Sequence, residues 1–101
     1  MDPDRERLTT ALSLPDKQAF KRAVLVEHFK PGVHSVGFVT GEVVDRATGR
    51  RLLKLFIPTA PNPTTGFVVM VAPDKVQELS WTVPEAMNVV ISGGIIGPDE
   101  L

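Results

Sequence analysis

The side chains best suited to chemistry are few and lie around one predicted turn. Two histidines, His28 and His34, flank Pro31-Gly32, and Glu27 precedes them. Imidazole and carboxylate groups held this close are candidate metal ligands. Their spacing matches no established ligand motif, and the sequence assigns no further ligand. We therefore expect ordinary surface histidines on a hairpin, and we predict neither a metal nor any other cofactor.

The remaining catalytic signatures are missing from the sequence. The chain has no cysteine, which excludes disulfides, thiol catalysis and cysteine-bound zinc. It contains no Gly-x-Ser-x-Gly elbow and no glycine-rich phosphate loop. Ser92, which precedes Gly93-Gly94, is better explained as the end of a helix. We predict that the chain is not an enzyme; the alternative is a small enzyme with its site near the proline-rich loop 58–66.

Basic residues gather around a predicted hairpin tip at Thr48-Gly49, and they are Arg46, Arg50, Arg51 and Lys54. Such a group can touch the phosphates of anionic lipid, although a short basic run is usually just a solvated hairpin. We take Arg46, Arg50 and Arg51 as candidates for a weak lipid contact. We predict no nucleic-acid partner, because the formal net charge is −1 and the five Phe and one Trp are needed for a core.

The proline-rich segment 58–66 is the most distinctive part of the sequence. Its three prolines, Pro58, Pro61 and Pro63, restrict both their own backbone and that of the residues before them. A stiff loop of defined shape is therefore predicted. One interpretation is a recognition surface offering polar groups, namely Asn62, Thr64 and Thr65. The other is a rigid crossover between two strands, and both interpretations stay open.

Apolar patterns predict the strands that must position these residues. The composition, 43% apolar and 23% charged, is that of a globular chain, and 101 residues fit one domain. Strands are expected at 22–29, 33–40 with a continuation at 42–44, 51–57, 67–72 and 76–79. Segment 67–72 is the longest unbroken apolar run, so we expect it to be central. A segment of about 20 apolar residues, as needed to cross a bilayer, is not found in the sequence.

Helix signals stand at both ends. Asp2-Pro3 indicates a helix start within a segment that carries Leu8, Ala11 and Leu12 on one face. Near the other end, Thr82-x-x-Glu85 is a capping box. An apolar stripe follows it: Val83, Ala86, Met87, Val90 and Ile91. We predict that the last helix is core, with Met87 and Val90 buried.

These elements predict an α+β fold of one domain. Short connections favour antiparallel pairing, so we expect a curved, mostly antiparallel sheet or small open barrel of four to five strands. Helices from both chain ends should pack on it. Within the chain we distinguish an N-terminal helical segment or linker at 1–19, the domain itself at 20–96, and a polar tail at 97–101.

Three segments together resemble a known family. They are Val26-Glu27 with 36–42 (Val-Gly-Phe-Val-Thr-Gly-Glu), 56–67 (Phe-Ile-Pro-Thr-Ala-Pro-Asn-Pro-Thr-Thr-Gly-Phe), and 83–94, which ends in Ser-Gly-Gly. The chain resembles, over about 20–96, the conserved membrane proteins called domain of unknown function 502, whose plant relatives are the continuous vascular ring and like-cov proteins.

The resemblance implies a membrane-associated protein of bacterial type, with two transmembrane helices ahead of this domain. Those helices are not in this sequence, and the positive-inside rule would leave the domain on the cytoplasmic side. The family implies no established activity. We therefore expect a binding or scaffolding domain linked to membrane organisation or traffic. Its expected partner is a protein, with a second copy of the chain as one candidate.

Overall fold

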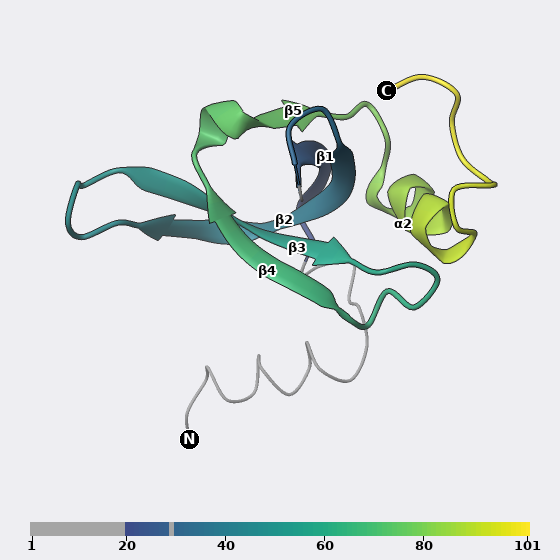
Figure 1. The fold of residues 1–101 in the computed structure, drawn as a ribbon, viewed down its shortest axis with the longest axis horizontal. Coiled ribbons are helices and arrows are strands. Elements are labelled where there is room, and N and C mark those ends of the chain that lie inside the picture. The colour runs from purple at the N-terminus through teal and green to yellow at the C-terminus, as the bar shows by residue number, and fades with distance from the viewer. Residues whose placement is uncertain (1–19, 29) are drawn as a thin grey trace.

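The computed structural model describes residues 20–28 and 30–101, which fold into a curled sheet with one α-helix beside it (Figure 1). The elements, in chain order, are β1 (Arg22–Glu27), β2 (His34–Val44), β3 (Arg51–Pro58), β4 (Gly66–Val71), the short 3-10 helix η1 (Pro73–Lys75), β5 (Val76–Glu78) and α2 (Val83–Ile91). The helical segment predicted at 1–19 lies outside the described residues.

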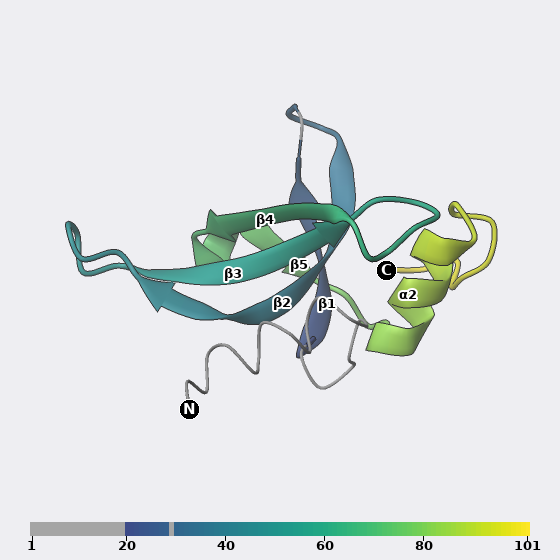
Figure 2. The same cartoon turned by 90° about the horizontal axis from the view of Figure 1, so that it is seen from below.

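The five strands form one sheet in the order β4-β3-β2-β1-β5, and every pairing is antiparallel. The two edge strands, β4 and β5, are joined only by residues 72–75, three of which form η1. In a flat five-stranded sheet the edges would lie about 19 Å apart, whereas a 3-10 helix rises only about 2 Å per residue. The sheet therefore curls, as Figures 1 and 2 show, and the predicted curved antiparallel sheet is confirmed.

Alternation along the strands gives the curled sheet two apolar faces. The inner face holds the larger group of buried side chains, which are Val24, Val26, Val39, Leu53, Leu55 and Ile57. The outer face carries Ala23 and Phe38, which pack with Ala86 of α2. The outer cluster also takes in half-buried neighbours, which are Phe20, Val36, Leu79, Trp81, Val83 and Met87.

The start of α2 is fixed by the predicted capping box. The Thr82 hydroxyl accepts from the backbone N–H of Glu85 at 3.2 Å, and the Glu85 carboxylate accepts from the backbone N–H of Thr82 at 2.8 Å. Val90 is buried as predicted, whereas Met87, which was also predicted to be buried, is only half-buried against the outer cluster. Ile91, the last residue of the apolar stripe and of the helix, is 51% exposed.

Two strand predictions need correction. Segment 67–72 is not central: β4 is an edge strand, with Phe67 47%, Val68 64% and Met70 49% exposed. Its composition resembles that of a strand buried on both faces, but no described element covers its outer face. The segments 33–40 and 42–44 form the single strand β2, in which the register shifts between Val39 and Gly41. A bulge there bends the strand without ending it.

Candidate functional site

The proline-rich loop between β3 and β4 is closed by its own hydrogen bonds. The backbone N–H of Thr59 donates to the Thr65 carbonyl at 2.9 Å, which extends the β3–β4 pairing into the loop. The Thr59 hydroxyl lies 3.0 Å from the Asn62 carbonyl oxygen and also meets the Thr65 hydroxyl. The Ala60–Pro61 peptide bond is cis. The loop thus has the defined shape that its prolines predict.

The three predicted recognition residues of this loop lie together and bond to one another. The side-chain oxygen Oδ1 of Asn62 accepts from the Thr64 backbone N–H at 3.1 Å and from the Thr64 hydroxyl at 2.5 Å. The Thr65 hydroxyl lies 3.3 Å from the Asn62 carbonyl. All three side chains are exposed. These side chains therefore cap groups within the loop and also face solvent. The loop thus has features of both a rigid crossover between two strands and a recognition surface.

Gly66 closes the loop at the first position of β4, where it pairs with Pro58. A Cβ atom built at Gly66 would lie 2.1 Å from the Ile57 carbonyl oxygen and 2.8 Å from the Pro58 Cα. Both are backbone atoms, so no side-chain adjustment can make room. Glycine is required here for the close approach of the two strands.

The chain that follows α2 passes beside this loop and carries exposed apolar residues. Both ribbon views place segment 58–66 next to the C-terminal end of α2 and the turn that follows it (Figures 1 and 2). That turn and the helix end expose three isoleucines: Ile91 at 51%, Ile95 at 88% and Ile96 at 62%. We call these isoleucines together with the loop 58–66 the end surface. Ile95 and Ile96 were not predicted as site residues; their only signal was an apolar pair between glycines.

The turn that carries these isoleucines is held in place. The Ser92 hydroxyl accepts from the Ile96 backbone N–H at 2.9 Å. Gly97 runs so close to the helix that a Cβ there would lie 2.3 Å from Val89. The tail beyond it is tied back, because the Trp81 indole N–H donates to the Glu100 carbonyl at 2.5 Å. The isoleucines are thus displayed on an ordered turn.

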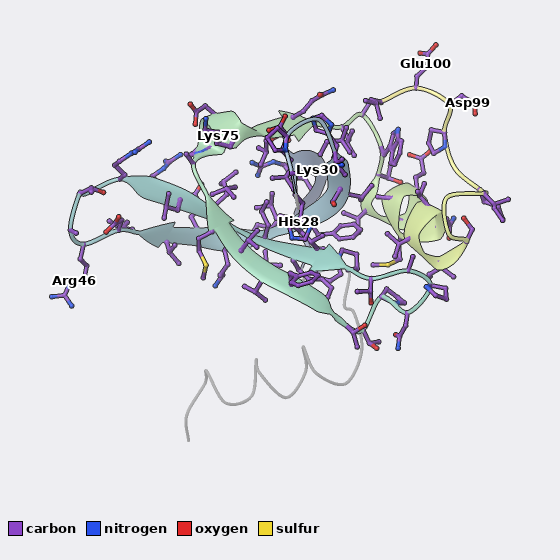
Figure 3. The ribbon with its side chains drawn as sticks, viewed as in Figure 1. His28, Lys30, Arg46, Lys75, Asp99 and Glu100 are labelled. Carbon is purple, nitrogen blue, oxygen red and sulfur yellow. The ribbon has the colours of Figure 1, made fainter. Side chains whose placement is uncertain are left out.

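The hairpin arginines (Arg46, Arg50 and Arg51) lie at the opposite end of β3. Figure 3 shows Arg46 at the tip of the β2–β3 hairpin, pointing away from the sheet. All three are exposed, and Arg51 lies 3.7 Å from a carboxylate oxygen of Glu42. From Arg51 to Pro58, the first and last residues of β3, the strand advances by seven residues, or about 23 Å. The hairpin arginines and the end surface are therefore separate sites.

The two histidines do flank one turn, as predicted. His34 pairs with Glu27, and His28 packs edge-on against Phe67 with ring centroids 5.0 Å apart. A hollow of about 590 Å³ opens nearby, and its polar lining includes Glu27, His34, Asp74 and Lys75. In the described ranges no three His, Asp or Glu side chains converge as metal ligands would.

Comparison with known proteins assigns the family. Across residues 20–28 and 30–101, no helix has the length and apolar character needed to span a bilayer. Neither a curated protein nor a solved structure matches the chain. A family model described as "Protein of unknown function (DUF502)" matches residues 5–65, from the N-terminal segment through β3 to the proline-rich loop. This confirms the family that the sequence resembles: the chain belongs to the DUF502 family of proteins of unknown function.

Proposed function

We propose that this chain is a non-enzymatic binding domain that presents its end surface to a protein partner. One observation carries the proposal: a loop held rigid by its own hydrogen bonds stands beside three isoleucines that are 51%, 88% and 62% exposed. In the full-length protein we place the domain at a membrane, on the cytoplasmic side, as the family resemblance implies.

The physical case rests on the cost of ordering. A loop that already has its bound shape loses little conformational freedom when a partner docks. Protein interfaces combine an apolar centre with a polar rim. Here Ile95 and Ile96 supply apolar area, and the exposed groups of Asn62, Thr64 and Thr65 supply a rim. Contiguous exposed apolar side chains bordered by polar groups mark interaction sites more often than isolated ones do.

The hairpin arginines fit this arrangement as a secondary contact. Their charge can attract anionic headgroups, at about 1 kcal/mol for each residue near the surface. Because they lie at the far end of β3, such a contact would leave the end surface open to a partner. We propose this membrane contact as weak and dependent on salt.

The test uses the full-length protein in its own cells, with a photo-crosslinking residue in place of Ile95. The matched control carries it in place of Val44, which is 61% exposed near the hairpin tip. A protein captured from position 95 and not from position 44 is then purified and titrated against the chain. Ile95→Asp should weaken its binding at least about tenfold, or ~1.4 kcal/mol. Equal capture at both positions, or unchanged binding by Ile95→Asp, would reject the end surface.

A further inference from the structure

The two edges of the sheet differ in how they are protected. The edge strand β5 has only three residues, and its last residue, Glu78, bonds to Arg22 of β1 at 2.7 Å. The other edge strand, β4, has six residues (Gly-Phe-Val-Val-Met-Val), and none of them is charged or proline. Its register against β3 runs without a shift, so no bulge interrupts it. Short length, charge, proline and bulges prevent an edge from pairing with another strand; β5 is short and charged, whereas β4 has none of these features.

The backbone of β4 carries donors and acceptors on its free side. The Thr59 N–H bonds to the Thr65 carbonyl, and hydrogen-bonded pairs alternate along antiparallel strands. By this count Pro58, which has no N–H, falls in a non-bonded pair, as it must. The same count directs the N–H and C=O groups of Val68 and Met70 away from β3. No backbone group within residues 20–28 and 30–101 bonds to them.

The side chains of these two residues are apolar and exposed. Val68 is 64% and Met70 49% exposed, on the outer face of the sheet beside Phe56 and Lys54, with which they pair. An occupant of this edge must therefore supply backbone donors and acceptors together with apolar side chains. An added β-strand offers both.

We infer that β4 pairs antiparallel with β4 of a second copy of the chain, about a two-fold axis, and so joins two five-stranded sheets into one. With Val68 opposite Met70 of the second copy, both residues turn their backbone groups toward the partner strand. Such a pair exchanges two hydrogen bonds, and the symmetry creates the pair twice. The two side chains then lie on one face with Cβ atoms about 4.5–5.5 Å apart.

The distribution of charge favours a second copy as the occupant. A strand that pairs with itself must not bring like charges together across the axis, and segment 64–72 has no charged residue. When the same register is continued, Asp74 falls opposite Thr64 and Lys75 opposite Pro63, so like charges on the two chains do not face each other. The contact is isologous, meaning that each copy uses the same strand, and β5 is protected. Association therefore stops at the dimer.

Sedimentation equilibrium of the whole chain tests this inference. One strand pair is small beside a standard interface of about 1,600 Å², so we expect a weak dimer with a dissociation constant of about micromolar or above. Val68→Lys places a charge on the edge and should raise that constant at least about tenfold. The matched control is Val44→Lys, at a position 61% exposed on β2, and it should leave the constant unchanged. Met70→Lys provides a second edge variant, and urea unfolding checks that each variant folds.

Disulfide trapping reads the register, because the chain contains no cysteine of its own. A mixture of Val68→Cys and Met70→Cys chains should crosslink about tenfold faster than Val68→Cys alone, whose two cysteines would lie diagonally across the pair, too far apart for a relaxed disulfide. Equal or reversed rates would overturn the inferred pairing.

Three results in sedimentation would overturn the inference. A chain that stays monomeric at about 1 mM would leave the edge to an extended segment of another protein. A dimer that persists unchanged in both edge variants would have its interface elsewhere. A dimer that Ile95→Asp dissociates would use the end surface instead. Because Ile95→Asp is expected to leave the β4 dimer intact, failure here is distinguishable from failure of the proposed binding function.

Discussion

Replacing Asn62 by alanine tests whether the proline-rich loop is held by its side chains. The change removes the acceptor of two hydrogen bonds, from the Thr64 N–H at 3.1 Å and the Thr64 hydroxyl at 2.5 Å. A hydrogen bond contributes about 0.5–1.5 kcal/mol net, and exposed groups that water can satisfy lie at the low end. We therefore expect Asn62→Ala to lower the free energy of unfolding by about 1–2 kcal/mol.

The assay is urea unfolding followed by the fluorescence of the single tryptophan, Trp81. A change in stability should move the midpoint and leave the slope unaltered. At about 4–8 °C per kcal/mol for a domain of this size, the melting temperature should fall by roughly 5–15 °C. Asn62→Asp is the matched control, because its carboxylate keeps an acceptor at the same place. It should retain most of the stability.

The double variant Asn62→Ala, Thr64→Ala sharpens the result. Among the described residues, the hydrogen bonds of Thr64 go to Asn62, so removing the Thr64 side chain after Asn62 should cost little more, and the two changes should not add. Full additivity would mean that the two side chains act independently. An unchanged midpoint for Asn62→Ala would show that the bonds contribute nothing. A loss above about 4 kcal/mol would indicate a core role.

Three further outcomes follow from the packing. Gly66→Ala should lower the free energy of unfolding by about 1–3 kcal/mol or more, because the added Cβ would lie 2.1 Å from a backbone atom. Thermal melts compare it with Gly37→Ala, where the added Cβ would lie 3.5 Å from the nearest atom. In urea unfolding, Val90→Ala should lower the free energy of unfolding by about 1–3 kcal/mol, whereas Ile91→Ala should change it by no more than about 0.5 kcal/mol. Equal losses of stability would mean that the end of the helix is buried. Mutating the hairpin arginines to glutamine should abolish sedimentation with anionic liposomes at low salt, and sedimentation that persists at high salt would contradict an electrostatic contact.

Local structure followed from local sequence. Three features each depend on neighbours within a few residues: the capping box at Thr82, the turn at Thr48-Gly49, and the hydrogen bonds within the segment 58–66. Such features involve one turn of chain, so side-chain chemistry alone specifies them. The family likewise followed from sequence; its model matches residues 5–65, which include the Pro-Asn-Pro-Thr motif but not the segment 83–94.

Strand order was decided by the tertiary structure. An apolar run such as 67–72 predicts a strand but not its neighbours, because hydrogen bonding to the next strand is non-local. Here β5 pairs with β1 at one edge of the sheet and β4 pairs with β3 at the other, although only η1 and one residue separate β4 from β5 in the chain. The same run would fit a strand buried on both faces, and Val68 and Met70 are exposed because no described element covers the outer face of β4.

For the candidate site, too, some residues could be chosen from the sequence and others only from the tertiary structure. Asn62, Thr64 and Thr65 could be chosen from the sequence because prolines make their loop stiff. Ile95 and Ile96 could not, because a short apolar pair is as compatible with a core as with a surface. Their exposure depends on how the turn after α2 folds back, fixed by Ser92 and by the close approach of Gly97 to Val89. The sequence thus determined the pieces of the end surface, and long-range packing decided that the turn after α2 lies next to the loop 58–66.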